Sequence, residues 1–161
     1  MKNQALFALL AALLAPLSFA AFTPHAYAKP VYIGVEGGNI AVSGYDIVSY
    51  FDGDGVPVKG QADFAVEHDG AAYHFANAAN AARFQANPDA FVPRYGGHCA
   101  WAMSRGYLAP GDPLAYAVVD GKLYLNFNQE VKAKWDRDRA GFIAAAEKHW
   151  AVIPKDAKFG G

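Results

Sequence analysis

Apolar and polar positions along the chain alternate in short runs that predict two β-hairpins. Each hairpin consists of two runs joined by Asp-Gly: residues 64–68 and 71–75 around Asp69-Gly70, and residues 116–119 and 122–127 around Asp120-Gly121. Asp-Gly between two short β-prone runs is a strong signal for a two-residue turn, because both turn positions need a positive φ.

A helix is expected after each hairpin. Asn77 is placed to cap a helix over residues 78–86, which Asn87-Pro88 should end. Asn128 is placed to cap a single longer helix from residue 129 to about 150. Its apolar residues fall mainly at spacings of four and seven, which predicts one buried face: Val131, Trp135, Phe142, Ala146 and Trp150.

The two patterns lie 51 residues apart, which predicts an internal repeat. Several pairs match at this spacing: Asp69 with Asp120, Tyr73 with Tyr124, Asn77 with Asn128, Phe84 with Trp135, and Phe91 with Phe142. The alternative is a chance recurrence of Asp-Gly hairpins before helices. We therefore expect an α+β fold of two hairpin–helix (ββα) units with antiparallel strands, spanning roughly 62–95 and 114–150. They should pack as one small domain over 29–150, followed by a loose tail at 151–161.

The N-terminus has the three parts of a secretory signal peptide. Lys2 is the positive residue, residues 5–15 form an apolar run, and Ala26-Tyr27-Ala28 is a cleavage site of small residues. We expect residues 1–28 to be removed and the mature protein to be periplasmic or secreted. A second cut after Ala20 and a buried N-terminal helix are the alternatives.

Composition narrows the function classes. The 161 residues are 53% hydrophobic and 18% charged, with a net charge of −1, so a disordered chain is not expected. No basic run indicates a nucleic-acid partner, and no mature segment is expected to span a membrane. With 1 Cys, neither an internal disulfide nor a Cys-x-x-Cys motif can form.

The segment between the two units carries the candidate chemistry. Cys99 follows Gly96, Gly97 and His98, and it precedes a short apolar stretch that predicts a helix beginning at Ala100. At a helix N-terminus the thiol pKa should fall below the value of about 8.5 for a free Cys. The two glycines should leave space for a ligand or an attacking group.

The same thiol has a metal-binding interpretation. Cys99, His98 and Met103 are soft donors of the kind that Cu(I) prefers, and His74 in the first hairpin is a further candidate. The alternative is structural, because a free Cys is among the most buried residue types and Met103 also suits a core. No Ser-His-Asp order, P-loop or dinucleotide motif is recognisable, so we do not expect a classical enzyme.

Four motifs in order resemble exported YHS-domain proteins, over roughly residues 41–150. They are Gly44-Tyr45-Asp46-Ile47-Val48-Ser49-Tyr50-Phe51; Tyr73-His74-Phe75 with Phe84, Asn87-Pro88-Asp89, Phe91 and Tyr95; Gly96-Gly97-His98-Cys99-Ala100; and Asp120-Gly121-Lys122-Leu123-Tyr124-Leu125-Asn126. YHS domains occur in copper-transporting ATPases and in some multicomponent hydroxylases, so the resemblance implies copper or another soft metal.

The chain departs from that family where the metal would bind. The cysteine positions of the metal-type domain fall on Ser49, Ala76 and Asn80, none of which is a thiol. Cys99 lies outside that set, at a position where the resemblance implies selenocysteine in some exported members. This favours thiol reactivity at Cys99.

Three hypotheses follow for the exported domain. It is a soft-metal module with Cys99 as the first ligand, a thiol-redox protein in which Cys99 is oxidised or forms a mixed disulfide with a partner, or a structural or interaction domain with a buried Cys99. The sequence leaves the substrate, the partner and the oligomeric state open.

Overall fold

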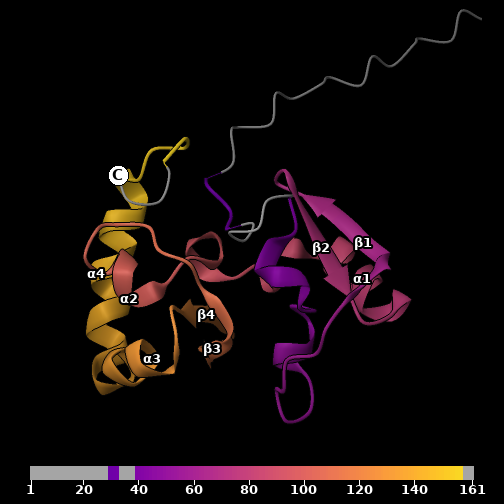
Figure 1. Cartoon of the computed structure of the whole chain (residues 1–161), viewed down its shortest axis with the longest axis horizontal. Helices are drawn as coiled ribbons and strands as arrows, with labels where there is room; N and C mark the ends of the chain where they lie inside the picture. Colours follow the sequence, from indigo (N-terminus) through magenta and orange to yellow (C-terminus); the bar gives the residue numbers. More distant parts are fainter. Residues whose placement is uncertain (1–28, 33–38, 158–161) are drawn as a thin grey trace, which may run out of the picture.

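The computed structural model describes residues 29–32 and 39–157 and confirms a small α+β fold of two hairpin–helix units. Figure 1 shows the two units side by side. The elements of the first unit are η1 (Ala41–Gly44), η2 (Ser49–Phe51), β1 (Gln61–His68), β2 (Ala71–Phe75), α1 (Ala78–Ala86) and η3 (Pro88–Ala90). Those of the second are η4 (Arg94–Gly97), α2 (Ala100–Met103), β3 (Asp112–Val119), β4 (Lys122–Asn126), α3 (Gln129–Trp135), η5 (Asp136–Asp138) and α4 (Arg139–Val152).

The two hairpins have the same register. Strands β1 and β2 pair antiparallel, as do β3 and β4, and each sheet has two strands. The irregularity in pairing between Gln61 and Ala65 returns between Asp112 and Tyr116, 51 residues later. Both Asp-Gly turns have positive φ at both positions, as their sequence predicts.

The helix caps also recur. The side-chain oxygen of Asn77 accepts from the Asn80 N–H, and that of Asn128 accepts from the Val131 N–H. These bonds satisfy backbone donors that a helix leaves unpaired in its first turn.

The single helix expected over 129–150 is wrong. The chain leaves the helical conformation at Asp138, with φ −154° and ψ 65°, and a separate helix, α4, follows. Asn87 has nearly the same angles, φ −155° and ψ 77°, 51 residues earlier. The second unit therefore repeats the helix end of the first, and the Asp138 side chain caps α4 through the Gly141 N–H.

The similarity of the units continues upstream of the hairpins. Val42, Ser43 and Gly44 have positive φ in succession, and so have Tyr95, Gly96 and Gly97, 53 residues later. Each left-handed segment leads into a short helical stretch. The spacing changes from 53 to 51 because 14 residues lie between Asp46 and β1, whereas 12 lie between Cys99 and β3.

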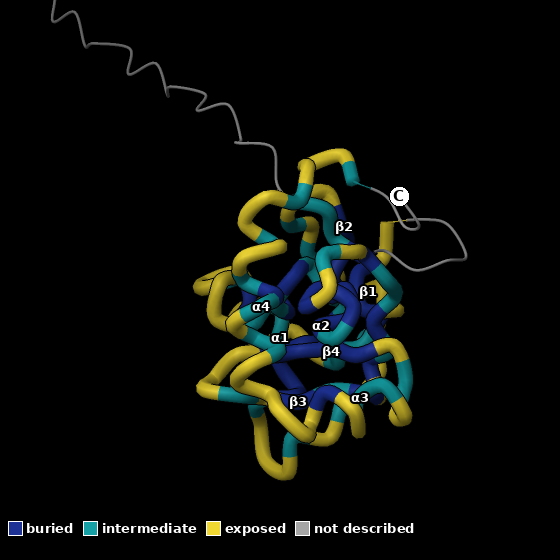
Figure 2. The backbone as a smooth tube through the Cα atoms, turned by 90° about the vertical axis from the view of Figure 1, so that its left-hand side faces the viewer, coloured by how far each residue is buried: buried dark blue, intermediate teal, exposed yellow. Residues whose placement is uncertain are grey.

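Two clusters of buried side chains form the core. The first surrounds Phe84 and Phe75 and also takes Leu123 and Leu125 from β4, so a strand of the second unit completes the core of the first. The second surrounds Trp135, Tyr124 and Met103. Figure 2 shows buried backbone at β4 and α2 in the interior of the molecule. The units are also joined by the Tyr50 hydroxyl, which donates to the Pro113 carbonyl at 2.9 Å.

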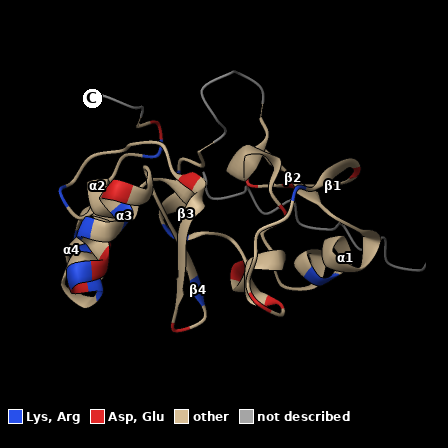
Figure 3. Ribbon diagram, turned by 60° about the horizontal axis from the view of Figure 1, so that its bottom comes forward, with Lys and Arg blue, Asp and Glu red and all other residues tan. Residues whose placement is uncertain are grey.

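Charged residues gather on α3 and α4, as expected for the solvated side of this region (Figure 3). Lys132 and Arg139 both pair with Asp136, and Lys134 pairs with Glu130. Among the described residues, none of the helices has the length and apolar character needed to cross a bilayer.

Residues near both ends of the described chain contact the second unit. Ile153 and Ala157 are partly buried and pack against the second core cluster. At the other end, the Tyr32 N–H donates to the Gly96 carbonyl, and the Lys29 ammonium binds the Trp150 carbonyl. The expected signal peptide, residues 1–28, lies outside the described residues.

The equivalent positions of Phe84 and Trp135 give a stability prediction. Both side chains are fully buried at matching points of α1 and α3. Replacing either by Ala should lower the free energy of unfolding by about 3–5 kcal/mol, because the change leaves a cavity in the core. Urea unfolding measures the loss, and Leu114→Ala, at a side chain 51% exposed, is the control. A loss below about 1 kcal/mol at either aromatic position would contradict the assigned core.

Candidate functional site

Cys99 lies at the corner between η4 and α2, and its residue is fully buried. Its N–H donates to the Ala109 carbonyl at 2.9 Å, and it forms a parallel bridge with Leu125 of β4. The expected helix does begin at Ala100, with Cys99 as its N-cap residue.

The glycines before Cys99 do not line the cavity over its sulfur, which corrects the expectation that they open that space. A Cβ at Gly96 would collide with the Pro30 carbonyl, so the missing side chain lets the segment 29–32 pack against η4. Gly97 has φ +82°, a conformation that favours glycine.

Backbone N–H groups surround the sulfur. The Ala102 N–H donates to Cys99 Sγ at 3.5 Å, whereas the Trp101 N–H donates to Asn126 Oδ1 at 3.3 Å. The N–H groups of Trp101 and Phe127 favour the thiolate electrostatically. The thiol itself donates to Asn126 Oδ1, with the two heavy atoms 3.9 Å apart. Cys99 Sγ thus occupies a cradle of hydrogen-bond donors from α2 and from the residue after β4.

Burial raises the pKa of the Cys99 thiol, so the expected lowering is wrong. The three backbone N–H groups and the charge of Arg105 act in the opposite direction, because they stabilise the thiolate. Removal of the sulfur from water has the larger effect. At neutral pH the group is therefore a neutral thiol.

An apolar cavity of about 230 Å³ lies over this corner, with Cys99 in its floor. The surrounding residues are Trp101, Ala102, Tyr107, Ala109, Phe127 and Val131. Phe127 and Tyr107 are 50% and 42% exposed, whereas Cys99 is 0% exposed, so the thiol lies just below an open apolar surface. A small uncharged molecule fits this setting better than a charged one.

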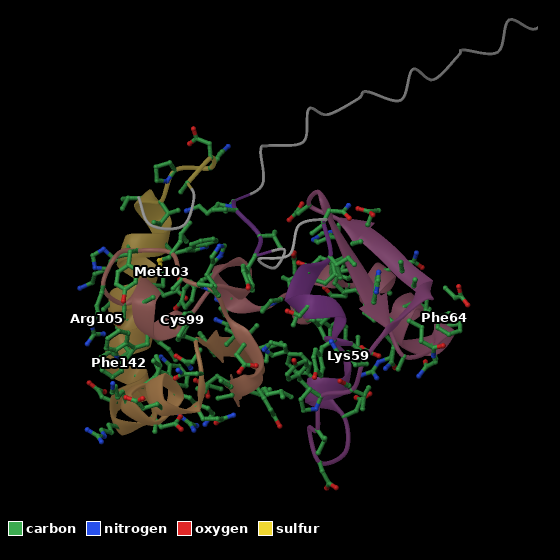
Figure 4. All side chains as sticks on the ribbon, viewed as in Figure 1. Lys59, Phe64, Cys99, Met103, Arg105 and Phe142 are labelled. Atoms are coloured by element: carbon green, nitrogen blue, oxygen red, sulfur yellow. The ribbon has the colours of Figure 1, made fainter. Side chains whose placement is uncertain are left out.

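The proposed metal ligands are not brought together. His98 Nδ1 is 2.8 Å from the Tyr95 carbonyl oxygen, and its ring packs near Tyr32 and Trp150. Burial lowers the pKa of His98. Met103 packs in the second core cluster (Figure 4). His74 lies in the other unit, against Gly44.

No three His, Cys, Asp or Glu side chains in the described part of the chain are placed to hold one metal ion. Cys99, His98 and His74 therefore do not form such a group in the structure. The neighbouring residues His98 and Cys99 have different surroundings. The His98 ring lies near the rings of Tyr32 and Trp150, whereas the Cys99 sulfur lies against the backbone at the start of α2.

Sequence reasoning missed Asp46, a fully buried carboxylate in the first unit. Its Oδ1 accepts from the Val48 N–H at 2.9 Å. Its Oδ2 accepts from the Ala76 N–H at 2.8 Å and from Asn80 Nδ2 at 2.7 Å. Ser49, whose hydroxyl donates to the Asp46 carbonyl, completes the network.

Asp46 and Cys99 occupy equivalent corners. The Asp46 N–H donates to the Val58 carbonyl as the Cys99 N–H donates to that of Ala109. The equivalence of Asp46 and Cys99 could have been found in the sequence, because Gly44-Tyr45-Asp46 and Gly97-His98-Cys99 lie 53 residues apart, the spacing seen upstream of the hairpins. The positions that the YHS resemblance equates with metal-type cysteines, Ser49, Ala76 and Asn80, all lie around Asp46.

Comparison with known proteins gives no further guide to the site: no family model, curated protein or solved structure matches the chain.

The network around Asp46 predicts a large loss of stability in Asp46→Ala. The change leaves the N–H groups of Val48 and Ala76 and the Asn80 amide without their acceptor. The free energy of unfolding should fall by about 3 kcal/mol or more, since each unsatisfied buried donor costs roughly 1–3 kcal/mol. Chemical denaturation measures it, with the exposed Asp54→Ala as a matched control. Equal stability of the two variants would refute the structural role of Asp46.

Proposed function

We propose that the chain is an exported thiol module in which Cys99 reacts with small molecules that enter the apolar cavity. The observation that carries this proposal is the position of the sulfur, inside a cradle of backbone N–H groups and directly beneath an open apolar surface. N–H donors around a sulfur stabilise the negative charge that develops when the thiol loses its proton or attacks an electrophile.

Thiol chemistry has more support than a dedicated metal site. The described residues do not place His98, Met103 or His74 as co-ligands of Cys99. Ser49, Ala76 and Asn80 stand where the YHS resemblance implies cysteines. They lie around the hydrogen-bonded side chain of Asp46. Copper binding by Cys99 alone stays a hypothesis, and no contact in the structure favours it.

The raised pKa has a functional consequence. A thiol kept neutral at pH 7 is protected from indiscriminate reaction, since the thiolate is the nucleophile. The apolar walls add a second filter, because they favour small neutral reactants over charged ones. We therefore propose a selective thiol, in contrast to a generally reactive one.

A structural role for Cys99 is the competing hypothesis. Its full burial favours this alternative, because a buried Cys also serves as a small hydrophobic residue. The pocket favours the reactive thiol, because Cys99, although it is 0% exposed, is one of the residues that line it.

Alkylation of the native protein tests the proposal. Methyl methanethiosulfonate, which is small and neutral, should modify Cys99 in the folded protein at least tenfold faster than the anionic iodoacetate does, relative to their rates with a free thiol. The rate of modification should keep rising with pH beyond about 8.5, the pKa of a free Cys, because burial raises the pKa of this thiol. Intact-mass measurement follows the reaction, with Cys99→Ser as the unreactive control.

A second variant probes the pocket. Val131 lies in the pocket wall, and Val131→Ala should speed the modification by widening the entrance. If native Cys99 is modified only under denaturing conditions, in both the natural protein and Val131→Ala, then Cys99 is a core residue and the proposed function is wrong.

A further inference from the structure

The same corner of the two units holds two different side chains. In the first unit it holds the carboxylate of Asp46, and in the second the thiol of Cys99. The donors correspond in position: the N–H groups of Val48 and Ala76 bind Asp46, and those of Trp101 and Phe127, at matching positions, favour the Cys99 thiolate electrostatically.

The contact distances differ between the two corners. Asp46 accepts its three hydrogen bonds at 2.7–2.9 Å through two oxygen atoms. Cys99 Sγ, which takes the place of the Asp46 carboxyl carbon, has its N–H partner Ala102 at 3.5 Å. The cavity of about 230 Å³ leaves room above the sulfur. The N–H donors and the space above the sulfur in the second unit thus suit a side chain with two acidic oxygens as well as a thiol.

We propose that Cys99 is a site of oxidation to the sulfinate, whose two oxygens take the positions that the carboxylate oxygens of Asp46 take in the first unit. The proposal deepens the proposed function and rests on it, because an oxidant must reach the sulfur through the apolar cavity. A cysteine sulfinate and an ionised aspartate have the same branching and the same charge. The Asp46 corner of the first unit therefore shows where the two sulfinate oxygens are expected to lie in the second.

Asn126 provides an independent observation. Its side chain is fully buried beside the sulfur, and its Nδ2 has no hydrogen-bond partner in the described structure. Its Oδ1 accepts from the Cys99 thiol and from the Trp101 N–H. A buried amide nitrogen without an acceptor is costly and calls for an explanation.

Oxidation of Cys99 removes this cost. The sulfinate has no S–H to donate and carries two acceptor oxygens. A half-turn of the Asn126 amide then directs Nδ2 at a sulfinate oxygen, as Asn80 Nδ2 is directed at Asp46 Oδ2 in the first unit. The Trp101 N–H, released by Asn126, donates to the sulfinate as the Val48 N–H donates to Asp46.

The oxidant is a hydroperoxide, used twice. In each step the sulfur attacks the terminal peroxide oxygen, the O–O bond breaks, and water or an alcohol leaves. The sulfur loses two electrons in each step and the peroxide gains them, which gives first the sulfenic and then the sulfinic acid. The sulfinic acid releases its proton to solvent at neutral pH. With 1 Cys in the chain, no second thiol can intercept the sulfenic acid by forming an internal disulfide.

The direct test is treatment of the folded, mature protein with hydrogen peroxide or tert-butyl hydroperoxide. Intact-mass and peptide analysis should find Cys99 carrying about 32 Da more, two oxygen atoms, in a form that dithiothreitol does not reverse. Little further conversion to the sulfonate should occur, because the cradle has donors for two oxygens. In Asn126→Ala the share of sulfonate should rise at least threefold.

A matched pair of variants tests the cradle without any oxidant. Cys99→Asp places a carboxylate where the sulfinate is expected, and Cys99→Asn has the same shape but turns an amide NH₂ toward N–H donors. At pH 7, Cys99→Asp should be the more stable of the two, with a higher midpoint of thermal unfolding. Its advantage should vanish as the pH falls and the carboxyl is protonated, because the N–H donors favour only the ionised form.

The outcomes separate this inference from the proposed function. A product that dithiothreitol reduces fully, or one that proceeds to the sulfonate, overturns the inference while alkylation still supports the reactive thiol. Cys99→Asp that is less stable than Cys99→Asn at pH 7 overturns the inference as well. If the native protein resists both alkylation and peroxide, the proposed function fails together with it.

Discussion

A buried hydrogen-bond acceptor at the corner before each hairpin ties together segments that are distant in sequence. Asp46 bonds to the start of its own helical stretch, to the residue after β2 and to the first turn of α1. Cys99 bonds to α2 through the Ala102 N–H and to the end of β4 through Asn126, and the Phe127 N–H favours its thiolate. Since buried backbone N–H groups must find partners, each corner requires an acceptor, and this requirement limits which side chains can stand there.

The two corners meet this requirement with different chemistry. A carboxylate that accepts three hydrogen bonds is a fixed structural element. A thiol is a weaker acceptor, lies under an apolar cavity and can change its oxidation state. The repeat thus gives one unit an acidic side chain and the other a group that, in our proposal, can be oxidised to one beside the unpaired Asn126 Nδ2 of the described structure.

Much of the fold could be predicted from local signals in the sequence. The Asp-Gly turns, the Asn77 and Asn128 caps and the two core aromatics follow from turn, capping and periodicity rules. The break at Asp138 was missed because an apolar face continues beyond it, although its equivalence with Asn87 was visible in the repeat. The position of Cys99 as an N-cap was predictable, but its raised pKa was not, because burial depends on contacts between distant segments.

Hydrogen exchange of single backbone amides, followed by NMR, tests the role of the two corners most directly. We predict that the N–H groups of Ala76 and Phe127 exchange only by global unfolding in the natural protein. Asp46→Ala should increase exchange selectively at Ala76, and Cys99→Ala should do so at Phe127, by at least tenfold beyond the change in global stability. If neither amide responds selectively, the corner side chains do not hold these segments together and the account is wrong.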